Sequence, residues 1–309
     1  MCKPSIILLF VALVLVPMAS RTAKAAEPFR VLSWNVESNR PNQSPVSDKD
    51  TIAIQLTDLM KQPATRAGIV ALSEVEPRTF DAYQKAIAVG LGSEVDYVTS
   101  ASGGFQDYDS LMIIVDKSRF VMLDVVELHR HGGISANFNV SDETADDFGT
   151  LRARSPLAAR IKDKSTNQTF WFIANHLARG EAELRTDQAK MLSQWAMDTK
   201  EPAITAGDFN FDFDFKTQQG NDGFKAMMAS GVWQWLKPDP LLDSNWADDR
   251  SITDRRVDRY PDSILDFVFV ANGAKNWRGE SDVVVREGDF PDNDKTSDHR
   301  PLITVFYPQ

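Results

Sequence analysis

The sequence predicts a single α/β domain in which stacked, mixed β-sheets carry helices on their outer faces. Two observations predict this class. Some strand-like segments follow one another directly, whereas others alternate with helical segments, so neither a purely parallel nor a purely antiparallel sheet accounts for the pattern. In addition, the 309 residues contain no Gly/Ser linker, no Pro-rich tract and no internal repeat, which favours one domain over two.

The first 25 residues have the layout of a secretory signal peptide. Lys3 gives a small positive region, residues 6–16 form an unbroken apolar run, and residues 23–25 (Ala-Lys-Ala) form a small-x-small cleavage site. The run is shorter than the roughly 20 helical residues that cross a bilayer, so we favour a cleaved signal over an uncleaved anchor. We therefore expect a signal peptide at 1–25, a folded domain at 26–309 and a secreted or periplasmic protein.

The charge and cysteine content narrow the function further. The chain has 34 basic and 44 acidic residues, for a net charge of −10, and removal of the signal peptide would take away three basic residues and no acidic one. A protein that binds nucleic acid through backbone charge usually has a basic face, so this balance argues mildly against a long polynucleotide groove. The only cysteine is Cys2, so the mature protein has neither disulfides nor thiolate ligands.

The first half of the chain alternates strands with helices. Residues 29–36 alternate and then turn polar, as at the end of a strand, and residues 68–74 form a short apolar strand that ends in an acid. Residues 50–61 have apolar side chains at helical spacing, with Ser47 or Asp48 as the N-cap. A second helix is predicted at residues 77–88.

The second half has more strands than helices. Apolar runs predict strands at residues 110–115, 156–161, 169–176, 203–208, 263–270 and 302–306. A long amphipathic helix is predicted at residues 180–198. Two polar stretches, residues 142–147 and 239–262, are predicted to be loops.

Polar residues of metal-ligand or acid–base type follow several of these strands. They are Asn35, Glu74, His176, Asp208, Asn210, Asp266, Asp298 and His299. Strand ends in layered α/β folds converge on one edge, where active sites commonly lie. Oxygen ligands without cysteine suit a hard cation such as Mg²⁺ or Mn²⁺, and two histidines can serve as general base and general acid. Each residue alone has an ordinary structural interpretation as a turn residue or a solvated acid, and the inference depends on the whole set.

The motifs that contain these residues resemble, in order, those of the endonuclease/exonuclease/phosphatase superfamily. They are Trp34-Asn35-Val36, Leu72-Ser73-Glu74, Asn175-His176-Leu177, Gly207-Asp208-Phe209-Asn210, Leu265-Asp266-Phe267-Val268 and Ser297-Asp298-His299-Arg300-Pro301. The resemblance extends from residue 30 to residue 306. It implies a four-layer sandwich, in which two packed mixed β-sheets are flanked by helices.

The resemblance also implies a metal site and a base. Asn35 and Glu74 would hold the metal ion, with Glu74 as the principal ligand, and Asp298 would complete or support the site. His299 would be the general base that activates water, and Asp266 would orient it.

The resemblance also implies that the remaining residues contact the phosphate of the substrate. Asp208 and Asn210 would bind it and position the nucleophile, while His176 would contact it and assist the leaving group. Asn175-His176-Leu177 resembles the two-histidine branch of nucleases, sphingomyelinases and inositol phosphatases. Ser73 departs from the pattern, because many members have glutamine there, and this puts the contact next to Glu74 in doubt.

We therefore expect an extracytoplasmic, Mg²⁺-dependent phosphodiesterase that acts as a monomer, with Mn²⁺ as an alternative metal. An endonuclease-like enzyme acting on nucleic acid is the first hypothesis. A sphingomyelinase- or inositol-phosphatase-like phosphoesterase acting on a lipid or inositol phosphate is the alternative, which the acidic charge slightly favours. A monoesterase is also compatible with such a site. The non-enzymatic alternative is a catalytically silent binding protein.

Overall fold

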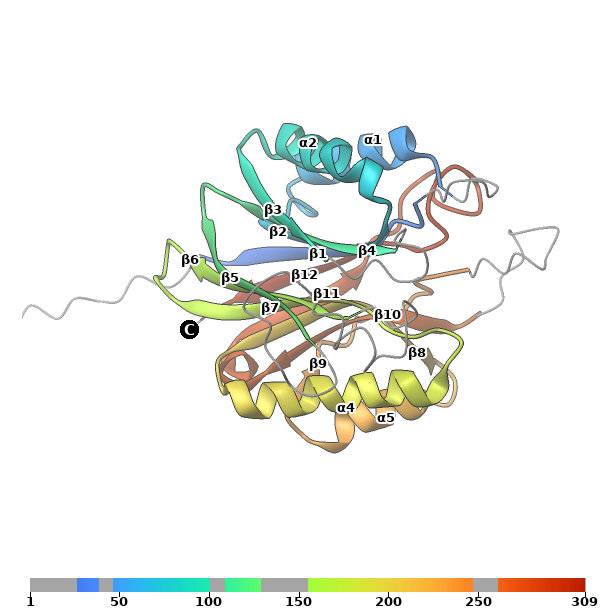
Figure 1. Ribbon diagram of the computed structural model, residues 1–309. Coiled ribbons are helices and arrows are strands. Elements are labelled where there is room, and N and C mark those ends of the chain that lie inside the picture. Colours follow the sequence, from blue (N-terminus) through green and yellow to red (C-terminus); the bar gives the residue numbers. More distant parts are fainter. Residues whose placement is uncertain (1–26, 39–46, 101–108, 129–154, 247–260, 309) are drawn as a thin grey trace, which may run out of the picture.

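The computed structural model describes residues 27–38, 47–100, 109–128, 155–246 and 261–308, and these form four layers (Figure 1). Two mixed six-stranded β-sheets pack face to face, and helices cover their outer faces. This confirms the predicted sandwich. The predicted signal peptide and most of the predicted loop at 239–262 lie outside the described residues, as does the stretch 142–147.

The first sheet has the strand order β11-β12-β1-β2-β4-β3. Its strands are β1 (Phe29–Asn35), β2 (Ile69–Val75), β3 (Val95–Thr99), β4 (Ser110–Asp116), β11 (Arg278–Val283) and β12 (Leu302–Tyr307). Only β1 and β2 pair in parallel, and every other neighbouring pair is antiparallel.

The second sheet repeats this plan, in the order β5-β6-β7-β8-β10-β9. Its strands are β5 (Phe120–Glu127), β6 (Leu157–Asp163), β7 (Thr169–His176), β8 (Ala203–Asp214), β9 (Trp233–Trp235) and β10 (Ser263–Ala271). Here β7 and β8 are the parallel pair. Each sheet therefore contains one strand–helix–strand crossover, α1 in the first sheet and α4 in the second, which accounts for the mixed pattern of the sequence.

Four α-helices form the outer layers of the described structure (Figure 1). Helices α1 (Lys49–Lys61) and α2 (Phe80–Leu91) cover the first sheet, and α4 (Ala182–Thr199) and α5 (Asp222–Ala229) cover the second. Asp48 caps α1 by accepting a hydrogen bond from the Thr51 amide at 2.8 Å. That bond lowers the pKa of the Asp48 carboxyl. None of these helices is both long and apolar enough to cross a bilayer.

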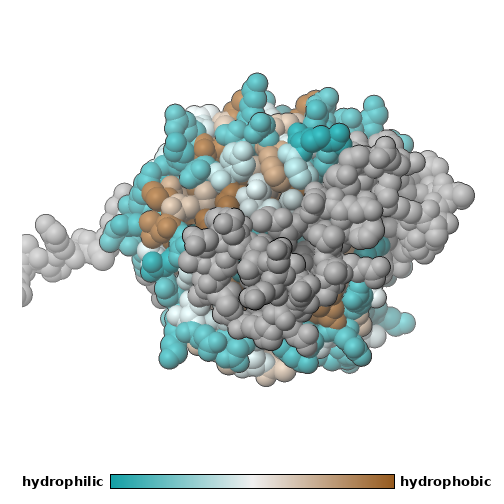
Figure 2. Space-filling view, viewed as in Figure 1, coloured by the Kyte–Doolittle hydropathy of each residue, from teal (hydrophilic) through white to brown (hydrophobic). Residues whose placement is uncertain are grey.

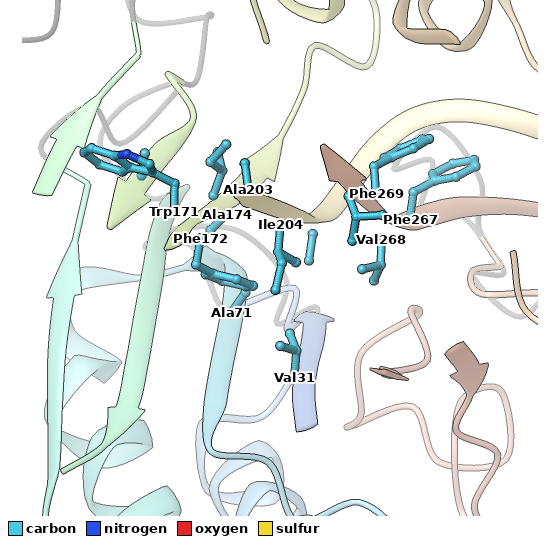
Figure 3. Packing of buried hydrophobic residues seen from close by; sticks show 14 of the residues in the cluster. Val31, Ala71, Trp171, Phe172, Ala174, Ala203, Ile204, Phe267, Val268 and Phe269 are labelled. Carbon is cyan, nitrogen blue, oxygen red and sulfur yellow. The ribbon is translucent and has the colours of Figure 1, made fainter. Parts of the chain in front are cut away.

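The two sheets meet through small and aliphatic side chains. Val31 and Ala71 of the first sheet face Phe172 and Ile204 of the second (Figure 3), and all four belong to one buried cluster. On the opposite face of the second sheet, Trp171 packs against Trp195 of α4, with ring centroids 5.4 Å apart. The second sheet is therefore buried on both faces, which explains its nearly continuous apolar strands.

The outer surface is mainly polar. On the face drawn in Figure 2, hydrophobic side chains appear in small groups between hydrophilic ones rather than in one large patch. The large exposed hydrophobic residues of the described chain are Ile54, Val89, Val121, Leu123, Met197 and Val285. Val121 and Leu123 share the edge strand β5, and the others lie in different parts of the chain, as is usual for scattered apolar residues on a protein surface.

The structure contains elements that the sequence did not predict, and most of them lie at sheet edges. They are β3, β5, β9, β11 and α5. Strands β3, β5, β9 and β11 are the four edge strands, where exposed and half-buried positions weaken the apolar pattern. Strand β8 also continues to Asp214, beyond the predicted end at residue 208, because Phe209, Phe211 and Phe213 alternate with polar residues.

Gly207 is required where β7 and β8 approach each other. Its φ is 142°, and a Cβ atom there would lie 2.1 Å from the backbone oxygen of Asn175. We expect Gly207→Ala to lower the free energy of unfolding by more than about 3 kcal/mol, because neither backbone can yield. Urea unfolding followed by circular dichroism measures this.

Gly231→Ala is the matched control. Gly231 also has a positive φ, 66°, but open space surrounds the missing Cβ. Gly231→Ala should lower the free energy of unfolding by only about 1–2 kcal/mol, because it adds the unfavourable backbone conformation without a steric clash. Equal losses in the two variants would show that the contact with Asn175 has no energetic weight.

Candidate active site

Strand register places three predicted site residues side by side in the second sheet. His176 of β7 and Asp266 of β10 are the Cα partners of Asp208 in β8. Directly paired residues project to the same face of a sheet, and here that face is the one that meets the other sheet. The Nε2 atom of His176 lies 3.5 Å from Oδ2 of Asp208.

The first sheet contributes Asn35 and Glu74 at the same edge. Asn35 ends β1, on the face that Val31 shares. Alternation would turn Glu74 toward the helices, with Leu72, but the register between β2 and β4 shifts after Leu72, and Glu74 has a φ of 54°. This irregularity directs the carboxylate into the site, as β-bulges near active sites commonly do.

The Asn35 amide joins the two sheets. Its Nδ2 donates to Glu74 Oε1 at 2.9 Å and to Asp208 Oδ2 at 3.1 Å. Its Oδ1 accepts a hydrogen bond from the backbone amide of Glu37 at 3.0 Å, which fixes the Asn35 side chain. One amide group thus holds two carboxylates from different sheets close together.

These carboxylates form a candidate metal centre. Oε1 of Glu74, Nε2 of His176 and Oδ2 of Asp208 all lie within 4.8 Å of one another. Within the described residues, no lysine or arginine forms an ion pair with Glu74 or Asp208. Asp208 is buried and Glu74 is half-buried, and carboxylates in such surroundings need a compensating positive charge. Oxygen-rich sites suit Mg²⁺, so this donor set fits a divalent cation.

The cluster differs in part from the ligand set predicted from the sequence. Glu74 is common to both, and Asn35 hydrogen-bonds to two of its members. Asp298 lies beside it, with Oδ1 3.9 Å from Nε2 of His299, and its backbone amide donates to Oε2 of Glu37 at 2.9 Å. The structure therefore adds His176 and Asp208 to the candidate ligands.

His299 is surrounded by carboxylates. Its Nδ1 lies 2.8 Å from Oδ2 of Asp266, and its Nε2 lies 3.7 Å from Oδ2 of Asp208. Burial lowers the pKa of the imidazole, but the charges of Asp266, Asp298 and Asp208 outweigh burial and raise the pKa well above 6.5. The contact at Nδ1 leaves Nε2 directed at the cluster, where a base would be needed.

The surroundings of Asp208 favour its ionised form. Burial raises the pKa of its carboxyl, but His176 and His299 lower it, together with hydrogen bonds from the Asn210 amide and from Asn35, and the net shift is downward. Asn210 has a φ of 52°, and its Nδ2 donates to the carbonyl oxygen of Leu177 at 3.0 Å. Asn210 therefore ties β8 to the segment after His176.

The segment with Ser297, Asp298 and His299 is anchored to β1. Ser297 Oγ donates a hydrogen bond to the backbone oxygen of Asn35 at 2.6 Å and accepts one from the His299 amide at 3.0 Å. Trp34 Nε1 donates to the backbone oxygen of His299 at 2.8 Å. The two bonds to β1 connect residues more than 260 positions apart in the chain.

Asp109 is a site residue that the sequence analysis missed. Its buried carboxylate has Oδ1 3.6 Å from Nδ1 of His176. The predicted site residues lie at or after the ends of strands, but Asp109 precedes β4, which runs antiparallel to β2. The start of an antiparallel strand lies at the same edge as the end of its neighbour, so a search of both strand ends would have found it.

A four-layer sandwich with carboxylates and histidines gathered at one sheet edge is the architecture of a class of phosphoester hydrolases. The sequence model of the Endonuclease/Exonuclease/phosphatase family matches residues 32–299, and the chain belongs to that family. Members of the family hydrolyse phosphoesters and usually use a divalent metal.

Solved structures agree on the fold. An endonuclease/exonuclease/phosphatase family protein from Bacteroides thetaiotaomicron superposes with a TM-score of 0.65 at 16% identity, over 93% of this chain and 100% of that one. A mannosyl-6-phosphatase from the same organism gives 0.63 at 16% identity, over 89% and 98%. D. rerio TDP2 complexed with a single-stranded DNA product gives 0.60 at 16% identity, over 90% and 98%. No curated protein sequence matches the chain.

The electrostatics of His299 give a direct test. In the metal-free protein, we expect this imidazole to titrate above pH 6.5, and Asp266→Asn to lower its pKa, because the nearest carboxylate stabilises the protonated ring. NMR titration of the histidine ring resonances measures both values. Asp282→Asn, which removes an exposed carboxylate on β11, should leave the titration unchanged. An unchanged His299 pKa in Asp266→Asn would contradict this account.

Proposed function

We propose that this protein is a divalent-metal-dependent phosphodiesterase that acts outside the cytoplasm, with nucleic acid as its leading substrate class. One observation carries the proposal. Glu74, His176 and Asp208 present converging ligand atoms beside His299, whose Nδ1 is 2.8 Å from Asp266. A cation centre and a paired imidazole at one edge are the two components that metal-assisted hydrolysis needs.

Glu74 and Asp208 would hold the metal ion, with Asn35 and Asp298 beside them and Mg²⁺ preferred over Mn²⁺. The bound ion would polarise a phosphoryl oxygen and stabilise the charge that develops on it. The downward pKa shift of Asp208 supports this role, because only ionised carboxylates bind such a cation well.

His299 would take the proton of the attacking water at Nε2, because the charge of the bound cation would lower the imidazole pKa that the neighbouring carboxylates raise. Its other nitrogen contacts Asp266, which would stabilise the imidazolium that forms. We assign His176 to the phosphate rather than to the ion. It lies between Glu74 and Asp208 on one side and Asp109 on the other, and it would contact the phosphate and assist the leaving group. Asn210 would help to place the phosphate through its position next to Asp208.

Three observations bear on the substrate, and they point in different directions. D. rerio TDP2, complexed with single-stranded DNA product, shares the fold and supports a nucleic-acid substrate by analogy only. The net charge of −10 favours a smaller ester, such as a lipid or inositol phosphate, and the mannosyl-6-phosphatase supports a monoester in the same way. A silent binding protein is the weaker alternative, because the constellation of acids and histidines is complete.

The first test is hydrolysis with and without a chelator. The substrates are bis-p-nitrophenyl phosphate, plasmid DNA, RNA, sphingomyelin and inositol phosphates, each with Mg²⁺. We expect chelator-sensitive hydrolysis that His299→Ala and Glu74→Ala each reduce by about 10²–10⁴-fold, the usual effect of losing such a group. Glu280→Ala, at an exposed glutamate on β11, is the matched control and should retain full activity.

The outcomes separate the alternatives. Cleavage of DNA or RNA supports the nuclease, whereas turnover of lipid or inositol phosphates alone assigns the protein to the other branch. Full activity in His299→Ala would refute the proposed mechanism. Silence on every substrate by folded, metal-loaded protein would favour the binding protein.

Export has its own test. We propose that residues 1–25 are removed and that residues 26–309 act outside the cytoplasm as a monomeric domain. Expression of the full chain in a bacterial host should give a mature protein that begins at Ala26 and is found in the periplasm or medium, as mass spectrometry and fractionation would detect. Ala25→Trp should block the cleavage. An uncleaved chain that stays with the membrane would indicate an anchor instead.

A further inference from the structure

A third side chain, that of Ser244, contacts the Asp266–His299 pair. Ser244 lies outside the named strands and is completely buried, with an exposed fraction of 0%. Its Oγ donates to Oδ2 of Asp266 at 2.7 Å, and this is the same oxygen that lies 2.8 Å from Nδ1 of His299. Both contacts therefore converge on one carboxylate oxygen.

The hydroxyl proton of Ser244 has a single direction available. Its Oγ accepts hydrogen bonds from the backbone amides of Leu265 at 3.1 Å and Asp266 at 3.3 Å. A serine hydroxyl has one proton and two lone pairs, so these two bonds fill its acceptor sites and leave the proton for Oδ2. Strand β10 therefore fixes the Ser244 hydroxyl through its backbone amides, and the same strand carries the Asp266 carboxylate that the hydroxyl contacts.

The main chain of the same segment fixes His299 from the other side. The amide of Arg300 donates to the backbone oxygen of Ser244 at 2.7 Å, and the amide of Trp246 donates to that of Asp298 at 3.0 Å. Asn245 and His299 consequently form an isolated antiparallel bridge. Residues 244–246 therefore position both the backbone of His299 and the carboxylate that its ring contacts.

Asp266 depends on Ser244 because its other oxygen, Oδ1, is buried and has no hydrogen-bond partner among the residues that the structure describes. Within the described residues, loss of the serine hydroxyl would leave the carboxylate with His299 as its only side-chain hydrogen-bond partner. A buried carboxylate with one donor is poorly satisfied, so its plane would rotate toward other donors or water. The imidazole would lose its orientation as a result.

We propose that Ser244 is a positioning residue that holds Asp266, and through it His299, in the geometry needed to accept a proton. Its kinetic consequence depends on the proposed hydrolytic function, but its structural consequence does not. The tests therefore include one measurement of each kind.

The kinetic test compares two substitutions with hydrolysis of bis-p-nitrophenyl phosphate in Mg²⁺. Ser244→Ala should lower kcat by about 10–100-fold and leave KM nearly unchanged, as is typical when the partner of a site residue is removed. Ser244→Cys keeps the shape of the side chain, with a somewhat larger atom in place of oxygen, but donates only weakly, so it should resemble Ser244→Ala. If the side chain merely fills space, the cysteine variant will resemble wild type, and the proposal is then wrong.

Two further proteins isolate the route. Ser281→Ala removes another buried hydroxyl, which contacts Thr304 at 3.0 Å and no site residue, and it should keep wild-type kcat. In a His299→Ala background, Ser244→Ala should cause no additional loss, because its effect passes through the missing imidazole. A full additional loss there would show that Ser244 does not act through His299.

The structural test is NMR of the His299 Nδ1–H proton, which a hydrogen bond to a carboxylate shifts downfield. We expect this resonance in wild type and Ser281→Ala, and its loss or broadening in Ser244→Ala and Ser244→Cys. An unchanged resonance in both Ser244 variants would overturn the proposal. If wild type hydrolyses none of the substrates, the proposed function fails while this measurement still decides the role of Ser244.

Discussion

The site depends on one contact between the two sheets, the amide of Asn35 between Glu74 and Asp208. Neither sheet holds the candidate centre alone, since the first supplies the Asn35 and Glu74 side chains and the second supplies His176, Asp208 and Asp266. The tightly packed core between the sheets sets their separation, and therefore sets whether this amide can reach both carboxylates. The packing of the core, although it lies away from the site, therefore controls the distances between the site residues.

The strands that carry these residues are regular in their buried parts and irregular where they reach the site. Glu74 and Asn210 have positive φ values, and the pairing of β2 with β4 shifts beside Glu74. Such conformations cost free energy and persist only where the surrounding structure determines them. Here the hydrogen bonds of Asn35 and Leu177 and the buried strands on either side supply that support.

Much of this arrangement was predictable from the sequence, and the omissions have physical causes. The strands that carry site residues are central and buried, so their apolar runs are clear, and the polar residues after them stand out. Strands β5 and β11 lie at edges and are half exposed, so their pattern is weak. Asp109 was missed because it lies just before a strand rather than at or after the end of one. Ser244 gave no signal, because a serine in a loop is ordinary, and only the fold brings it to Asp266. The direction of Glu74 was equally hidden, since simple alternation would turn it away from the site.

Strand β8 serves two faces of the molecule with one alternating pattern. Phe209, Phe211 and Phe213 project into the aromatic cluster under α5, where Phe211 and Phe224 lie 6.0 Å apart, while Asp208 and Asn210 take the intervening positions. Figure 3 shows the same division in the neighbouring strand, where Val268 points away from Phe267 and Phe269. A slip of one residue would exchange the two faces, placing carboxylates among the aromatic rings and the rings at the sheet edge. A chain with this shifted register would therefore lose its packed core and its active site together. A protease that degrades loosely packed chains would then also remove the inactive ones.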